Sequence, residues 1–550
     1  AGYEFQFIKT EVQDVNPLYG RDTYSGQFTR PPGAAANNLY NLADFMLGLR
    51  SQYALSNILI AHLRQRMQFV YLQDDFRVND KLTLNLGLRY EYATPQWETN
   101  SLWSNFDKDK VAMVMAKDGS IADRALVEPD RNNFAPRLGF AWTALPKTVV
   151  RGGFGVSYVH FNRIGAANVL AINGPQVVNA VVSQTNPTLP AFRTTQQGYP
   201  ENFADPSQFD PLKANVTYMD RNYHSSEVKS AYISVQRELT SNTVLDVAYV
   251  HNRADGMMMV ANYNQAVPNN AAASIPLQAR RPIQTFGDIT YVWNGGKSRY
   301  HGLQVKLEYR MRGGLMFLNS FTLSKAKDNG PGALENSNSG NVGPQDFYNM
   351  GPEYGTSNYD QPVNNTTSFV WELPFGHGRR WLNDAHPILN AVLGGWTISG
   401  INTMTSGAPA TLVYTPTASW AVSGISQEYR GSNTYRPNVT GSPYGNKKSI
   451  TEYLSKTSVT IPADASQVYG NAPRNSVRLP WFWQLDFVAS KNFTLPFGRH
   501  TTLQVRAEAF NLLNRTNFAG LSTNRTSANF GTITSAFDAR QIQLGAKITF

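Results

Sequence analysis

The last eleven residues of this 550-residue chain, 540–550, alternate almost without fault between apolar and polar side chains. Successive side chains on a β-strand point to opposite faces, so the pattern predicts a strand with one apolar and one polar face. The apolar positions are Ile542, Leu544, Ala546, Ile548 and Phe550. The positions between them are Gln541, Gln543, Gly545, Lys547 and Thr549. Such a strand suits a boundary between an apolar medium and water.

The clearest hairpin, residues 64–92, repeats this pattern in its second strand. One face carries Leu82, Leu84, Leu86, Leu88 and Tyr90. The other face carries Thr83, Asn85, Gly87, Arg89 and Glu91. On a lipid-facing surface near the middle of a membrane, a charged side chain costs roughly 2–4 kcal/mol. Arg89 and Glu91 are therefore expected to point into the bore of a barrel.

Two strands joined by a short turn and followed by a long polar loop form a unit that recurs along the chain. Strands are expected near 1–9, 62–77, 82–93, 133–143, 148–160, 228–239, 243–252, 299–310, 315–325, 362–373, 395–405, 482–495, 501–511 and 540–550. Outer-membrane barrels have short periplasmic turns and long extracellular loops, whereas a soluble sandwich has no reason to sort its loops in this way. The sequence thus predicts an all-β fold, a transmembrane antiparallel β-barrel with about 14 strands, in a single domain over residues 1–550.

The composition is compatible with a barrel and argues against other classes of protein. The hydrophobic fraction is 41% and the mean hydropathy is −0.36. No apolar run approaches the ~18 residues of a membrane helix, but barrel strands are apolar on one face only. The absence of cysteine argues against a disulfide-rich secreted domain and favours a bacterial envelope protein. The net charge of +10 is dispersed without a basic block, so no nucleic-acid partner is expected.

No catalytic constellation is recognisable in the sequence. The eight histidines are dispersed, and there is no HExxH pair, GxSxG elbow or phosphate-binding GxxxxGK loop. The adjacent residues Asp74 and Asp75 would face opposite ways on a regular strand and so would not share one cation. The sequence therefore predicts no enzyme activity, no cofactor and no metal site.

Two sets of side chains are candidates for contact with a solute. Polar strand residues would line the bore, where they would pair with one another or with a plug, or tune the selectivity of an open channel. They are Arg89, Glu91, Gln304, Lys306, Glu308, Arg310, Arg506 and Glu508.

Loop aromatics would stack on sugars or apolar solutes outside the cell, and loop guanidinium groups, Arg436 among them, would hold anions. The loop candidates are Trp97, Trp103, Arg221, Tyr223, Trp293, Tyr354, Tyr359, Trp420, Tyr429, Arg430 and Tyr435. Strand aromatics such as Trp371 and Trp396 are expected instead in an interfacial girdle.

Four stretches occur in a recognisable order along the chain. They are FVYLQDDF (69–76) with LTLNLGLRYE (82–91), FVWELPFG (369–376) leading into LGGWTISG (393–400), RAEAFNLLNRTNF (506–518), and the terminal strand. Together they resemble the TonB-dependent outer-membrane receptors, in particular the Oar-like branch. A last strand that stops on phenylalanine is also typical of the closing strand of a bacterial outer-membrane barrel. The resemblance spans nearly the entire chain.

The resemblance implies a barrel of about 22 strands around an N-terminal plug, with a TonB box that reaches the periplasmic energy-coupling protein. No plug, box or preceding β-sandwich is recognisable here, so this chain is expected to be the C-terminal part of such a receptor, or to be completed by other segments. The implied function is energy-coupled uptake of a large solute (an oligosaccharide, a peptide or a chelate) across the bacterial outer membrane. The implied partners are outer-membrane lipid and lipopolysaccharide, a TonB-type protein acting through the missing N-terminal region, and a surface lipoprotein or other loop-binding protein.

Two other functions remain open from the sequence. A complete barrel of 14 strands with no energy input would be a passive porin. A surface protein would instead use its long loops to bind partner proteins or polymers.

Overall fold

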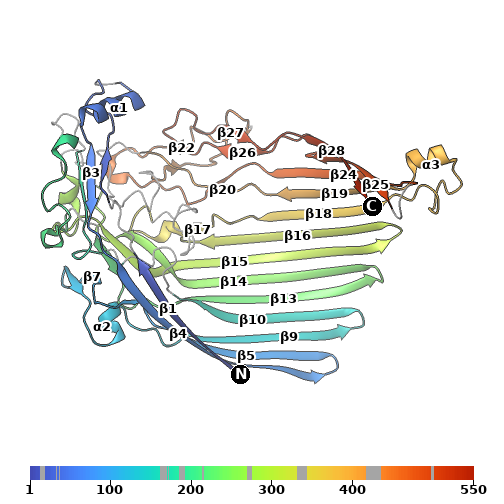
Figure 1. Ribbon diagram of the computed structural model, residues 1–550, viewed down its shortest axis with the longest axis horizontal. Helices are drawn as coiled ribbons and strands as arrows, with labels where there is room; N and C mark the ends of the chain where they lie inside the picture. The colour runs from blue at the N-terminus through green and yellow to red at the C-terminus, as the bar shows by residue number, and fades with distance from the viewer. Residues whose placement is uncertain are drawn as a thin grey trace.

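The computed structural model describes the whole chain except residues 13–18, 32–33, 36, 161–169, 171–172, 185–192, 213–215, 269–274, 331–343, 416–434, 447 and 497–500. Its main feature is a sheet of fourteen long antiparallel strands, each paired with the next long strand along the chain (Figure 1). These are β1 (Gly2–Val12), β4 (Ala61–Asn79), β5 (Leu82–Ala93), β9 (Phe134–Leu145), β10 (Thr148–Val159), β13 (Ser226–Thr240), β14 (Thr243–Asn262), β15 (Ile289–Arg312), β16 (Leu315–Asp328), β18 (Val363–Glu372), β19 (Trp396–Thr405), β24 (Phe482–Thr494), β25 (Thr502–Phe510) and β28 (Gln541–Thr549). All fourteen predicted strands are confirmed.

Short turns and long loops lie at opposite ends of this sheet, as the sequence predicts. The turns between β4 and β5, β9 and β10, β13 and β14, and β15 and β16 all lie at one end in Figure 1. The longer connection that contains α3 (Pro387–Leu393) also lies there, whereas α1 (Asn38–Leu47) and α2 (Ile121–Ala125) lie at the other end. Because short turns face the periplasm in outer-membrane barrels, we call these the periplasmic end and the extracellular end.

The strand register sorts the side chains of the sheet by polarity. Residues paired across two strands lie on the same face, so the register can be followed from strand to strand. We call the face that carries Arg89, Lys306 and Arg506 the polar face. On the opposite, apolar face, Leu84 pairs with Phe140 and Leu86 pairs with Leu138. Large exposed apolar side chains recur across this face, which suits hydrocarbon rather than water.

Strand aromatics follow the same division. Trp142 pairs with Val150, Trp371 with Ile398, and Trp396 with Lys491, all on the apolar face. Tyr90, Tyr92, Tyr158 and Trp483 also lie on that face. The placement agrees with an interfacial girdle, in which amphipathic rings lie between hydrocarbon and water.

The described parts of the long loops pack into a cap at the extracellular end, which we call the extracellular cap (Figure 1). Besides α1 and α2 it contains the short strands β2 (Arg21–Thr23), β3 (Gln52–Ser56), β6 (Trp97–Glu98), β7 (Ser104–Asp107), β8 (Ala112–Met115), β11 (Asn179–Ser183), β12 (Val216–Met219), β17 (Gly355–Thr356), β20 (Pro409–Ala410), β21 (Asn438–Val439), β22 (Val459–Thr460), β23 (Val477–Arg478), β26 (Phe518–Leu521) and β27 (Ile533–Ala536). Short 3₁₀ helices span Thr195–Gln197, Pro206–Gln208, Leu277–Arg280, Gly351–Glu353 and Ala465–Gln467. The sequence did not predict these elements.

Large buried apolar clusters lie in this cap and where it meets the strand ends. One cluster joins Leu63 of β4 to Trp103, Leu126 and Tyr223. A second cluster, formed by residues later in the sequence, contains Leu454, Leu412 and Phe530. The cap is thus held by ordinary hydrophobic burial, although it belongs to the same chain as the membrane sheet.

The two outermost strands each have one paired side among the described residues. β1 pairs with β4, and β28 pairs with β25, but no described pairing joins β1 to β28. Each outer edge therefore presents a row of backbone N–H and C=O groups, and such groups need partners inside a membrane. Among the described residues, no helix has both the length and the apolar character needed to cross a membrane.

Candidate functional site

A groove of about 780 Å³ lies along the sheet and is lined by polar-face residues of several strands, including Arg89, Arg137 and Asn252. Glycines on the polar face open this groove because they carry no side chain. At Gly153 the need for glycine is steric, since a Cβ atom there would lie 2.6 Å from the ring of Tyr232. The groove gives the bore a concave wall with hydrogen-bonding groups.

Arg89 and Glu91, both expected in the bore, pair with each other on the polar face. Arg89 Nε donates to Glu91 Oε1 at 2.9 Å, and Arg89 Nη2 donates to Glu4 Oε2 at 3.3 Å. The guanidinium also lies 4.5 Å from the ring centre of Phe69. His160 Nε2 lies 2.8 Å from Glu91 Oε2 and closes the network on its extracellular side. These charges are therefore satisfied within the protein, which reduces the cost of burying them.

The remaining six residues expected in the bore lie on the same face. Glu308 accepts from Arg310 Nε at 2.9 Å and lies 3.4 Å from Lys306 Nζ. Arg506 Nε lies 3.5 Å from Glu508 Oε1, and Gln304 stands opposite Thr322 in the register. Because positive and negative groups alternate along each strand, the wall is locally neutralised. Contact of these residues with a solute stays a prediction.

Four of the loop candidates are buried in the extracellular cap. Trp97 lies on β6, and Trp103, with 3% of its surface exposed, packs in the same cluster as Tyr223. Burial raises the pKa of Tyr223, so its phenol stays protonated. Tyr435 packs against Tyr414 and Tyr469. The side chains of these four residues thus contribute to packing.

Three of the loop candidates present their side chains to solvent, and three lie outside the described residues. Arg221, Tyr354 and Tyr359 are exposed, and Arg221 Nε donates to Glu128 Oε1 at 2.9 Å. Trp293 is partly exposed on β15. Outside the described residues lie Trp420, Tyr429 and Arg430.

Trp293 belongs to an aromatic stack at the base of the cap. The Tyr291 ring stacks on Trp293 with centres 4.7 Å apart and on Tyr218 with centres 4.6 Å apart. Phe347 meets the Trp293 ring edge-on at 6.1 Å. Burial, together with the nearby Asp220, raises the pKa of Tyr218 to about 12. The stack forms a rigid apolar block near the extracellular mouth of the bore.

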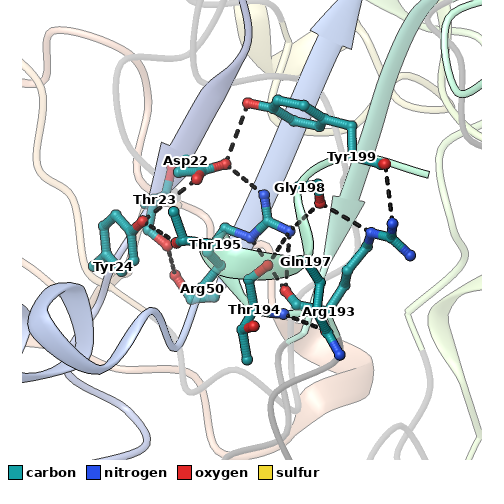
Figure 2. Close-up of polar contacts among 11 residues, drawn as sticks. Asp22, Thr23, Tyr24, Arg50, Arg193, Thr194, Thr195, Gln197, Gly198 and Tyr199 are labelled. Carbon is teal, nitrogen blue, oxygen red and sulfur yellow. Dashed lines mark hydrogen bonds and ion pairs between the residues drawn. The ribbon is translucent and has the colours of Figure 1, made fainter. Parts of the chain in front are cut away.

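Arg50, just before β3, ties its own segment of the cap to two distant ones, around residue 22 and over residues 194–198 (Figure 2). Only 1% of its surface is exposed. Arg50 Nη1 donates to Asp22 Oδ1 at 2.9 Å, and Nη2 donates to the carbonyl oxygens of Thr194 (3.0 Å) and Gly198 (2.7 Å). Tyr199 covers the guanidinium and donates its hydroxyl to Asp22 at 3.2 Å. A buried cation of this kind is tolerated because every side of it is paired.

Three further arginines are paired with carboxylates inside the cap or at its base. Arg436, expected to hold a solute anion, instead makes a two-pronged contact with Glu353 at 2.8 and 2.9 Å, and both side chains are buried. Arg474 pairs with Asp328, and Arg478 pairs with Asp360. Sequence reasoning missed these partners because they are separated by 83 to 146 positions and carry no local pattern.

The helix α1 has the reverse of the usual distribution of polar and apolar side chains. Asn37 caps its start by accepting from Leu39 N at 2.9 Å, while the buried Asp44 accepts from Thr29 N at 3.0 Å. The exposed side chains are Leu39, Leu42, Phe45, Met46 and Leu47. A surface helix normally turns its apolar side inward. This apolar patch is an unusual surface on the cap.

The described residues offer no group of three His, Asp or Glu side chains that could hold a metal ion. The polar face and the exposed loop side chains offer hydrogen-bonding, aromatic and charged groups, and binding of a solute by them stays a prediction. The predictions that the chain has no enzyme activity and no cofactor stay predictions.

Long paired strands with one apolar and one polar face, short turns at one end and packed loops at the other define an outer-membrane β-barrel protein. The model of the family described as outer membrane beta barrel domain matches residues 1–543, and the chain belongs to this family. The protein is therefore located in the bacterial outer membrane, which confirms the predicted fold class and location. No curated protein matches the chain.

Solved outer-membrane proteins are similar to this chain at low identity. The outer membrane transporter YddB from Escherichia coli is 11% identical, with 99% of this chain and 50% of that chain covered and a TM-score of 0.47. The FrpB iron transporter from Neisseria meningitidis is 12% identical, with 99% and 52% covered and a TM-score of 0.41. The ferripyoverdine receptor of Pseudomonas aeruginosa is 10% identical, with 89% and 39% covered and a TM-score of 0.40. The chain thus spans about half the length, or less, of these structures.

Proposed function

We propose that this chain is the barrel portion of a TonB-dependent receptor that takes up a large solute across the outer membrane. The observation that carries the proposal is the combination of a polar bore wall, holding a groove of about 780 Å³, with a packed extracellular cap above it. A receptor needs both a surface that captures a solute and a bore that accepts it. A passive porin has less use for a cap with several buried clusters.

Among the described residues, no strand pairs with the outer edge of β1 or of β28, and this supports a larger barrel. Unsatisfied backbone groups are expensive in hydrocarbon, so further strands must pair with both edges in the membrane. We infer that the single domain over residues 1–550 is completed by additional strands and that a plug fills the wider bore. A TonB-type periplasmic protein would act on that plug, and outer-membrane lipid and lipopolysaccharide would surround the apolar face.

The charge pattern of the bore favours a solute without a strong net charge of either sign. Glu308 is flanked by Lys306 and Arg310, and Arg89 lies between Glu4 and Glu91. Such a wall offers donors and acceptors without a large field of one sign. This supports an oligosaccharide, a peptide or a masked chelate as the solute, captured outside by exposed side chains such as Tyr354 and Tyr359.

The test uses the full-length receptor in its native membrane and in planar bilayers. The proposal would be supported if uptake of the solute stops when a protonophore removes the proton gradient, and if the receptor in planar bilayers has a low resting conductance. A steady conductance and uptake unaffected by the protonophore would identify a passive porin and overturn it.

A second candidate function, binding of a surface protein by the loops, is favoured by the exposed apolar side of α1. A surface lipoprotein with an apolar patch would cover Leu39, Leu42 and Met46. Because the printed sequence has no cysteine, a photoactivatable crosslinker on Leu42→Cys would report this contact in intact cells. Absence of any crosslinked protein would count against this second candidate.

A further inference from the structure

The helix α3 lies at the periplasmic end, in the connection between β18 and β19, and projects beyond the ends of the strands (Figure 1). Its apolar side chains Ile388, Leu389, Val392 and Leu393 are all exposed, Ile388 by 70% and Val392 by 59%. Since each helical residue turns by about 100°, these four cover a continuous arc of about 140°. The other side of the helix is used internally, because Asn390 Oδ1 accepts from His377 N at 3.0 Å.

Two side chains from the apolar face of the sheet hold α3 in place. Trp396 Nε1 donates to the carbonyl oxygen of Val392 at 2.8 Å. Lys491 Nζ donates to the carbonyl oxygens of Ala391 and Asn390 at 2.6 and 3.2 Å. Trp396 and Lys491 are register partners on the apolar face. The last carbonyl groups of the helix are therefore satisfied from the lipid-facing surface, which places α3 on the bilayer side of the barrel.

The residues just before α3 have the chemistry of a membrane interface. Trp381 is exposed, and the guanidinium of Arg380 lies 5.4 Å from the centre of its ring. The neighbouring Arg379 is instead paired with Glu372 at 3.0 Å. Tryptophan rings and arginine side chains are favoured at the headgroup level, where the apolar part meets acyl chains and the polar part meets phosphate and water.

We propose that α3 is an interfacial anchor that lies in the periplasmic leaflet of the outer membrane. Its apolar arc enters the boundary between headgroups and acyl chains, and Arg380 contacts phospholipid phosphate. The occupant is lipid rather than a periplasmic protein because the helix is continuous with the apolar face through Trp396 and Lys491. The anchor would fix the depth of the barrel at this side. The inference rests on the membrane location of the sheet and does not depend on the proposed transport.

The test places single spin labels on the full-length receptor in vesicles of phosphatidylethanolamine and phosphatidylglycerol. The printed sequence contains no cysteine, so Ile388→Cys and Val392→Cys give unique sites in this region. The matched control is Asn383→Cys, which is exposed in the same connection but lies outside the helix. Collisions with oxygen report hydrocarbon, and collisions with a nickel chelate report water.

Labels at 388 and 392 are expected to collide with oxygen at least threefold more often, relative to nickel, than the label at 383. Equal ratios at all three sites would show that the helix stands in water and would overturn the proposal. Low access to both reagents at 388 and 392 would show that protein covers α3, and would also overturn it.

A second measurement examines the phosphate contact. Arg380→Gln should lower the oxygen-to-nickel ratio at position 392 at least twofold in vesicles with phosphatidylglycerol. The control is Arg77→Gln near the end of β4, where Arg77 pairs with Asp80 of the following turn, and it should leave that ratio unchanged. An equal oxygen-to-nickel ratio at position 392 before and after the Arg380→Gln substitution would show that Arg380 is not part of the anchor.

Discussion

The membrane sheet and the extracellular cap are built from the same chain but place their apolar side chains in opposite ways. On the sheet, large apolar side chains such as Leu86 and Leu138 are exposed, and charged groups such as Arg89 turn toward the bore. In the cap, apolar clusters are buried, and so are ion pairs such as that of Arg436 with Glu353. The difference teaches that the surrounding medium, hydrocarbon or water, decides which face of an element is stable.

The largest effect is expected from breaking the buried ion pair of the cap. Glu353→Gln leaves the Arg436 guanidinium buried without its full countercharge, and removal of one partner of such a pair typically costs about 3–5 kcal/mol. We expect this loss in the free energy of opening the cap, with the sheet unaffected. Amide hydrogen exchange, measured separately for cap and sheet peptides, checks the prediction.

The matched control for that variant is an exposed pair in the same cap. Arg221→Met removes the contact with Glu128, where both side chains are largely exposed, and should cost at most about 1 kcal/mol. Equal effects of the two variants would show that burial of the Glu353 pair is unimportant.

A charge on the apolar face should have the next largest effect. Leu86→Arg places a guanidinium among lipid chains near the middle of β5 and should cost roughly 2–4 kcal/mol. Asn85→Arg, one residue earlier, points to the polar face beside Asp75 and should be tolerated. Unfolding of both variants in lipid vesicles by urea gives the comparison. A tolerated Leu86→Arg would mean that this face does not contact hydrocarbon.

Alanine substitutions at Gly153 and Gly155, two residues apart on the polar face, should differ in their effect on the free energy of unfolding. Gly153→Ala would put a methyl group 2.6 Å from the Tyr232 ring and should cost about 1–3 kcal/mol through displaced packing. At Gly155 the nearest atom to such a methyl group is 3.8 Å away, so Gly155→Ala should be neutral or slightly stabilising. The same unfolding measurement decides this, and equal costs would contradict the steric reason given for Gly153.

The smallest effect should come from alkaline pH, and it should be confined to the cap. Burial raises the pKa of Tyr218 and of Tyr453 to about 12, above the value of about 10 for an unfolded chain. Their contribution to stability is complete below pH 10 and falls as the pH rises toward 12, by about 1 kcal/mol per tyrosine at pH 11. The rate of cleavage of the cap by limited proteolysis should therefore increase as the pH rises from 9 to 11. The Tyr218→Phe variant should show a weaker dependence of this rate on pH.

Prediction from the sequence succeeded best where the pattern was local and regular. All fourteen strands follow from alternation, and their faces follow from the cost of placing charges such as Arg89 in lipid. The strands β14 and β15 extend well beyond their predicted extracellular ends because cap segments, β12 among them, continue the pairing there. Alternation did not reveal this extension.

Prediction succeeded least in the loops, where residue type alone does not report burial. Tyr359 and Tyr435 looked alike as loop tyrosines, yet Tyr359 is exposed and Tyr435 is buried against Tyr414. Arg436 looked like an anion-binding residue, but Glu353 already occupies its guanidinium. Contacts between segments far apart in the chain decide such cases.

By itself, the sequence determined the membrane sheet, because a period of two assigns every strand residue to lipid or to the bore without reference to distant parts of the chain. Only the tertiary structure decided which loop side chains are buried, which arginines are already paired, and that α3 is held against the apolar face by Trp396 and Lys491. The physical reason is that strand facing depends on neighbouring residues and the solvent. Burial in the cap depends instead on contacts between segments that the sequence separates by many tens of residues.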